Sequence, residues 1–173
     1  MEYYRRSLEI RQLFYGDSHP LVARLYQAIA TIYQALKDQD KTLEYYNRCL
    51  DSRKKALGDT HPEIAKLYNI IGYYYVASME LDNALEYFNS ALNIWKHAYG
   101  ESSLYMISAY VSICVVYLAK EDFAEGLRLF RIAYDLSEQI VGSDHPLTVK
   151  IKTQIDNLEL QLKKQSNNES AGQ

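Results

Sequence analysis

The 173-residue chain contains little cysteine, little proline and no long run of one charge. With only two cysteines, both inside helical patterns, we expect no disulfide framework and a reducing compartment. A net charge of −3 without a basic stripe argues against a nucleic-acid-binding protein. No apolar run reaches the roughly 20 residues that a membrane-spanning helix needs, and the charged first residues do not form a secretory signal. These absences predict a cytoplasmic protein without nucleic-acid or membrane partners, and leave an association with the cytoskeleton open.

Motifs that carry catalysis are absent as well. The chain has no Gly-rich phosphate loop of the G-x-G-x-x-G or G-x-x-x-x-G-K type. Cys49 and Cys114 have no local histidine partner, so we interpret them as small core residues and not as nucleophiles. The sequence therefore predicts no enzyme activity and no cofactor.

What the chain does contain is a strict period. Its residues Gly16, Gly58, Gly100 and Gly142 are each 42 positions apart. Three of them begin the related stretches G-D-S-H-P, G-D-T-H-P and G-S-D-H-P, which hold all three prolines. Glycine is typical just after a helix end, where a left-handed conformation is needed, and proline is typical of the first helical position. A fixed period of this length predicts a solenoid, in which each repeat buries its apolar face against its neighbours.

Each period holds two helical patterns. The first pattern of each full repeat, which begins near residues 20, 62 and 104, has residues of one wide face at i, i+3, i+4, i+7, i+8 and i+11. One central position of this face is small in all three copies, being Ala30, Gly72 and Cys114. The second pattern, which ends at the glycine, also carries small residues where the first would face it. Small residues on both sides predict an antiparallel hairpin of closely packed helices.

The second period carries the residues that point to a known repeat. Its length of 42 residues and its G-D-x-H-P loop resemble the kinesin-light-chain type of the tetratricopeptide repeat (TPR). The resemblance implies an all-α fold, a right-handed TPR superhelix built as a solenoid of antiparallel helical hairpins. The positions that match the spacing of the repeat are Tyr68, Ile71, Gly72, Tyr75, Ala84, Phe88 and Ala91.

The same register divides the chain into parts. We expect residues 1–164 to form a single TPR array, followed by a disordered tail over 165–173. The expected parts of the array are an orphan second helix over 1–15, full repeats over 20–57, 62–99 and 104–141, and a capping first helix over 147–164.

The two ends of the array are expected to differ. At the C-terminal end, Lys152 and Asp156 stand where tight packing positions would be, as suits a helix that caps the array. At the N-terminal end, the orphan helix keeps the packing residues Tyr4, Leu8 and Phe14. We therefore predict that these three residues pack against a partner, either upstream TPR repeats or another copy of the chain.

The histidines do not predict a metal site. His19, His61 and His145 share one loop position, one in each repeat. Successive repeats lie about two helix diameters, roughly 20 Å, apart, so the three side chains cannot share a coordination sphere. We interpret them as loop and cap residues, and expect no metal.

The resemblance implies a function as well as a fold. In TPR arrays the first helices line a concave groove that binds peptides or helices of partner proteins, so we predict a non-catalytic scaffold or adaptor. Two alternatives are a structural assembly subunit that stacks through its open N-terminal end, and a regulatory segment of a larger enzyme or motor-adaptor protein. The candidate groove residues are Arg24, Gln27, Thr31, Gln34, Lys66, Asn69, Tyr73, Ser108, Ser112 and Val115.

Overall fold

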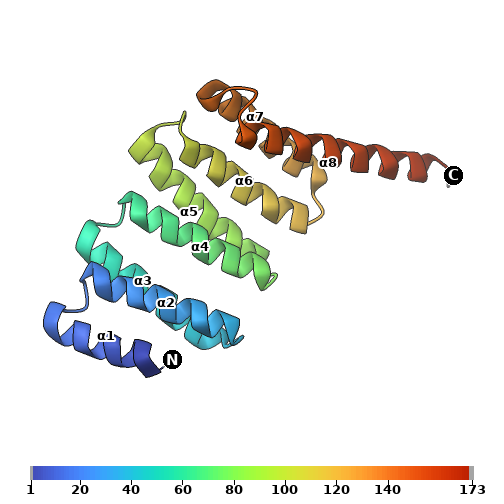
Figure 1. The fold of residues 1–173 in the computed structure, drawn as a ribbon. Coiled ribbons are helices and arrows are strands. Elements are labelled where there is room, and N and C mark those ends of the chain that lie inside the picture. The colour runs from blue at the N-terminus through green and yellow to red at the C-terminus, as the bar shows by residue number, and fades with distance from the viewer. Residues whose placement is uncertain (1, 172–173) are drawn as a thin grey trace. The chain divides into compact units, whose positions relative to one another are not determined.

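The computed structural model describes residues 2–171, and the side chains up to residue 164. Over these residues the chain forms α-helices and no strand (Figure 1). It divides into two compact units, Met1–Leu67 and Tyr68–Gln173, and the division falls inside α4. The helices are α1 (Glu2–Tyr15), α2 (Pro20–Ala35), α3 (Gln39–Leu57), α4 (Pro62–Ala77), α5 (Leu81–Tyr99), α6 (Leu104–Ala119), α7 (Phe123–Val141) and α8 (Pro146–Ala171).

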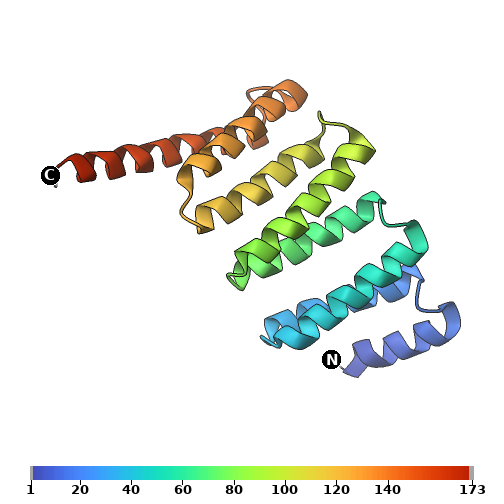
Figure 2. The same ribbon diagram turned by 180° about the vertical axis from the view of Figure 1, so that it is seen from behind.

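Unit 1 is built on the hairpin of α2 and α3, with α1 packed on α2. The two hairpin helices lie side by side in both views (Figures 1 and 2). The side chains of Ile29, Ala30 and Cys49 are fully buried, and Tyr46 is 2% exposed. The small residues Ala30 and Cys49 allow this close packing, as the sequence predicts.

Unit 2 holds α5 to α8 and the greater part of α4. Helix α6 packs on both α5 and α7, and α8 packs on α7. Gly72 leaves room for the ring of Phe88, because a Cβ added at Gly72 would lie 2.5 Å from that ring. The small position predicted from the repeat is therefore required here by an aromatic neighbour.

The first helix of each hairpin ends in a left-handed turn without glycine. Lys37, Met79 and Glu121, again 42 residues apart, have φ near 60°. In each turn two N–H groups bond back to carbonyls of the last helical turn, as from Asp38 to Tyr33 at 3.0 Å. This is the Schellman arrangement, which satisfies helix-end carbonyls.

The loops that follow α1, α3 and α7 depend on glycine and histidine, whereas the loop after α5 has Gly100 but no histidine. Gly58 has φ 88° and ψ 158°, a region that is open essentially to glycine alone. The positive φ that we expected at this glycine is thus confirmed. The ψ angle is wrong in our expectation, because it lies outside the left-handed helical range. His19, His61 and His145 then cap the next helix, each with Nδ1 3.2 Å from the backbone N–H two residues on.

The last helix is longer than the sequence predicted. Helix α8 continues to Ala171, whereas we expected it to end near residue 164 and to be followed by a disordered tail. Residues 165–171 contain neither glycine nor proline, so nothing in the sequence stops the helix there. Residues 172 and 173 of the expected tail lie outside the described residues. Ile151, Ile155 and Leu158 are buried, whereas Lys152 and Asp156 are exposed.

Candidate functional site

Unit 1 contains a cavity of about 420 Å³ between α2, α3 and the start of α4. Two of the predicted groove residues, Arg24 and Gln27, line it. Arg53 on α3 was not predicted, although its positive charge faces the same space. The remaining lining residues are Ser18, Pro20, Ala23, Ala56, Leu57, His61 and Glu63.

Hydrogen bonds hold Arg53 in place inside this cavity. Its Nη2 donates to Gln27 Oε1 at 2.7 Å, and its Nη1 donates to the backbone carbonyl of Glu63 at 3.4 Å. Arginine has five N–H donors, so part of the guanidinium group stays available. Arg24 is exposed and makes no side-chain interaction with the described part of the chain. The cavity therefore presents two guanidinium groups beside apolar walls.

Lys66, another predicted groove residue, forms an ion pair at the edge of this cavity. Its Nζ lies 2.6 Å from Glu63 Oε1, and this bond lowers the pKa of the Glu63 carboxyl group. Of the two predicted groove residues with positive charge, Lys66 is therefore partly neutralised by Glu63, whereas Arg24 is not.

The repeat register explains why a cavity forms beside Arg53. Forty-two residues on, the positions of Arg53 and Leu57 are occupied by Trp95 and Tyr99. In unit 2 these aromatic rings pack on Tyr105, at centroid distances of 5.4 and 4.5 Å. In unit 1, Arg53 takes the place of the indole and Leu57 takes the place of the second ring. These smaller side chains leave room for the cavity.

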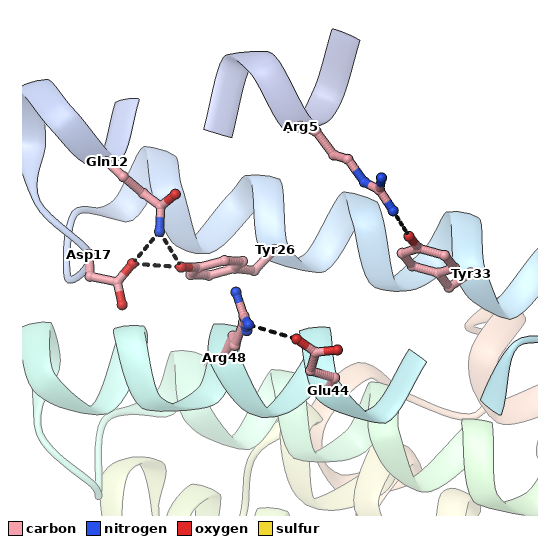
Figure 3. A network of polar contacts seen from close by, with 7 residues as sticks. All are labelled: Arg5, Gln12, Asp17, Tyr26, Tyr33, Glu44 and Arg48. Carbon is pink, nitrogen blue, oxygen red and sulfur yellow. Dashed lines mark hydrogen bonds and ion pairs between the residues drawn. The ribbon is translucent and has the colours of Figure 1, made fainter. Parts of the chain in front are cut away.

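A polar network fixes the loop beside the cavity (Figure 3). Tyr26 donates to Asp17 Oδ1 at 2.5 Å, and Gln12 Nε2 donates to both Asp17 and Tyr26 at 2.8 Å. These bonds lower the pKa of Asp17. Burial, followed by the bond to Asp17, raises the pKa of Tyr26 to about 12. Because Asp17 directly precedes Ser18, the network holds one edge of the cavity.

Two further polar pairs appear in the same view (Figure 3). Arg5 on α1 donates to the Tyr33 hydroxyl on α2. Arg48 pairs with Glu44 along α3 at 2.6 Å, outside the cavity lining. The first pair ties α1 to the hairpin, and the second provides a comparison arginine that does not face the cavity.

In unit 2 four of the five predicted groove residues meet in a polar cluster on α4 and α6. Ser112 Oγ lies 2.9 Å from Asn69 Oδ1, from the Ser108 carbonyl and from the Tyr73 hydroxyl. Ser112 is only 1% exposed, so its prediction as a groove contact is wrong. Its small side chain faces α4 and not solvent. Tyr73 stays 42% exposed, with its ring edge-on to Phe88 at 5.0 Å.

The other predicted groove residues differ in the exposure and in the hydrogen bonding of their side chains. Thr31 is exposed, but its hydroxyl bonds to the Gln27 carbonyl at 3.0 Å. Gln34 Oε1 accepts a hydrogen bond from Tyr46 at 3.0 Å. The side chain of Ser108 is exposed, and Val115 is half-buried.

A second cavity, of about 480 Å³, lies between α6, α7 and α8 within unit 2. Sequence reasoning missed it because we interpreted the last helix only as a cap. The signal was present as three carboxamides, Gln154, Asn157 and Gln161, at a spacing of one helix face. All three side chains are exposed.

Of the three residues predicted to pack against a partner at the N-terminal end, two are exposed and one is buried. Tyr4 is 41% exposed, whereas Tyr46 and Phe88 at equivalent positions are 2% and 1% exposed. Phe14 is 74% exposed. Leu8 is only 5% exposed, so its assignment to the open face is wrong. Like Leu50 one repeat later, it belongs to the core of unit 1.

Reactive and metal-binding groups do not gather in the described residues. Residues 2–164 hold no group of three or more metal-ligating side chains. Burial raises the pKa of Cys49 to about 11 and that of Cys114 to about 12, so both stay as thiols near neutral pH. None of the described helices is both long and apolar enough to cross a membrane.

Comparisons with known proteins agree with the repeat. The family model of the tetratricopeptide repeat matches residues 2–55 and 29–97. TPR-like repeats of Podosopora anserina, ascribed to a kinesin light chain, align with a TM-score of 0.76 at 15% identity, over 98% of this chain and 80% of that chain. A variant of those repeats gives 0.76 at 14% identity over the same shares. BtubC (BKLC) from P. vanneervenii gives 0.69 at 19% identity, over 97% of this chain and 71% of that chain. The search of curated proteins found no match.

At these identities the solved structures show the fold alone. Together with the family model they confirm two predictions, the all-α repeat fold and the resemblance to TPR repeats of the kinesin-light-chain type.

Proposed function

Because the chain belongs to the tetratricopeptide repeat family, whose members are commonly scaffolds for protein interactions, we propose that it is a non-catalytic adaptor. Its unit 1 cavity binds an acidic segment of a partner protein. The observation that carries this proposal is the cavity of about 420 Å³ in which Arg24 and Arg53 face apolar walls. The two buried, unpaired thiols suit the reducing cytoplasm.

The chemistry of the cavity favours a carboxylate next to an apolar group. A guanidinium group binds a carboxylate through parallel N–H···O bonds, which are stronger than neutral hydrogen bonds. Arg53 is already oriented by Gln27, so it loses little freedom on binding. Pro20 and Leu57 offer apolar area to a neighbouring side chain of the partner. An arginine anchor in such a pocket is worth about 2 kcal/mol or more of binding free energy.

The charge of the two units supports unit 1 as the acceptor of an acidic segment. Unit 1 has eleven Lys and Arg residues against nine Asp and Glu, whereas unit 2 has eight against thirteen. Acidic ligands are therefore attracted to unit 1 and repelled by unit 2, and the effect weakens as salt is added.

We include most of the predicted groove residues as further contacts, each within its own unit. In unit 1, Thr31 and Gln34 follow Arg24 and Gln27 along α2, and Lys66 follows on α4. In unit 2 the exposed or half-buried candidates are Asn69, Tyr73, Ser108 and Val115. We exclude Ser112 because its side chain is buried.

The test is an immobilised library of dodecapeptides that each carry a central Asp or Glu, paired with versions that carry Asn or Gln. The proposal predicts that acidic peptides bind and that their amide versions bind at least tenfold more weakly. Arg24→Ala should weaken binding of the acidic peptides. The control Arg48→Ala, outside the cavity, should leave their binding unchanged. Equal binding of acidic and amide peptides would refute the proposal.

A second candidate function, assembly through α1, rests on the open end. Tyr4 and Phe14 are exposed, and Tyr3 is 90% exposed beside them. Sedimentation velocity over a range of protein concentrations tests it. Self-association that Tyr4→Glu abolishes supports assembly, and a monomer at all concentrations contradicts it.

A further inference from the structure

Among the described side chains, those that line the unit 2 cavity between α6, α7 and α8 carry no charge. Two phenylalanines and three leucines form its apolar walls, and three carboxamides form its polar edge. All of the polar groups come from one helix, α8. The lining consists of Leu118, Phe123, Phe130, Gln154, Asn157, Leu158, Leu160 and Gln161.

The three carboxamides have no hydrogen-bond partner among the described side chains. Gln154, Asn157 and Gln161 are exposed and make no side-chain hydrogen bond within the described residues. They recur at i, i+3 and i+7, which places them along one face of α8. Their hydrogen-bonding capacity is therefore open to a ligand.

The repeat register explains why Gln154 is left unpaired. It is equivalent to Ser112, 42 residues earlier, which bonds to Asn69 and lies 2.9 Å from the Tyr73 hydroxyl. The residues equivalent to those two partners are Val111 and Val115, which offer no hydrogen bond. The polar cluster of α4 and α6 is thus not repeated between α6 and α8.

We propose that this cavity binds an uncharged, extended peptide segment of a partner protein. One bulky apolar side chain of the segment fills the space between the phenylalanines and leucines. The backbone N–H and C=O groups of the segment pair with the carboxamides of Gln154, Asn157 and Gln161.

The chemistry of the lining selects this occupant. A carboxamide both donates and accepts hydrogen bonds, as a peptide group does. A charged ligand would lie beside apolar walls without a counter-charge, which is costly. The three carboxamides span seven helical residues, or about 10.5 Å. About three residues of extended peptide cover the same length.

This site is separate from the proposed acid-binding cavity. It lies in the other unit, and it recognises peptide groups where unit 1 recognises carboxylates. Failure of one proposal therefore leaves the other testable.

The test is an NMR titration of the ¹⁵N-labelled full chain, observed at the side-chain NH₂ signals. The probes are N-acetyl-leucine methylamide, N-acetyl-leucine methyl ester, which lacks one N–H donor, and N-acetyl-aspartate methylamide. We expect the methylamide of leucine to shift the signals of Gln154, Asn157 and Gln161. The ester should bind about fivefold more weakly, the effect of one hydrogen bond, and the aspartate probe should not bind this site.

Variants separate hydrogen bonding from apolar contact. Asn157→Leu keeps the size of an exposed side chain and removes its carboxamide, so it should reduce the difference between the methylamide and the ester. Gln154→Ala should do the same, and the control Asp156→Ala, exposed on the same helix, should change nothing. Equal affinity for the methylamide and the ester would overturn the proposal, as would shifts confined to the carboxamides of unit 1.

Discussion

Packing leaves no room for a Cβ atom at Gly72 on α4. A Cβ added there would lie 2.5, 2.6 and 2.9 Å from three atoms of the Phe88 ring. Phe88 is 1% exposed and also packs against the Tyr73 ring, so it has little space into which to move. Gly72→Ala gains about 1 kcal/mol of helix propensity but costs about 1–3 kcal/mol of overpacking. We expect a net loss of about 1 kcal/mol.

The assay is urea unfolding followed by circular dichroism, and a double-mutant cycle isolates the clash. Phe88→Leu alone lowers the stability of unit 2 by removing buried area. In Gly72→Ala/Phe88→Leu the added methyl group occupies part of the vacated space, so the double variant should be more stable than the sum of the single losses by about 1 kcal/mol. Additive losses, or a Gly72→Ala variant as stable as the wild type, would refute this account of the hairpin.

Other predictions concern unit 1 and share the same unfolding measurement. Leu8→Ala should cost about 2 kcal/mol because Leu8 is buried, whereas Phe14→Ala, at an exposed position, should change stability by no more than about 0.5 kcal/mol. His19→Ala should cost about 1 kcal/mol by removing the cap of α2, and His19→Asn, which keeps an acceptor, should cost less. Asp17 has a lowered pKa, so its contribution is present above the ordinary value of 3.8 and is lost as the pH falls through the lower folded value. In Asp17→Asn the free energy of unfolding should therefore fall less steeply with decreasing pH below about pH 4. The pKa of Tyr26 is raised from 10.0 to about 12, so stability should be kept below pH 10 and lost as the pH approaches 12, and Tyr26→Phe should remove this loss. A flat pH profile in either range would contradict the network around Asp17.

The repeat and its hairpins could be predicted from the sequence because they depend on local, periodic signals. The glycines mark helix ends, and small residues such as Ala30 mark helix contacts. The Schellman turns could not be predicted in the same way, because Lys37 adopts a positive φ without being glycine. There the hydrogen bonds of the turn outweigh the intrinsic preference of the residue.

The binding sites were less predictable because they depend on volumes and on partners from other helices. Arg53 gains its importance only when Gln27 orients it and when no indole fills its place. Ser112 matched the periodicity of the groove, but its neighbours on α4 bury it. Leu8 matched a packing position, and only the placement of α2 shows which neighbour it packs against. Periodicity therefore identifies faces of helices, and three-dimensional neighbours decide which face stays free.

The most direct test of the central claim is the affinity of an acidic peptide for Arg53→Trp, measured by calorimetry. This variant copies the residue found at the equivalent position of the next repeat, Trp95, so it should stay folded with a filled cavity. If unit 1 binds the acidic segment, Arg53→Trp should bind the peptide at least tenfold more weakly than the wild type and should keep the same unfolding midpoint. If Arg53→Trp binds the acidic peptide as tightly as the wild type does, the cavity is not the binding site.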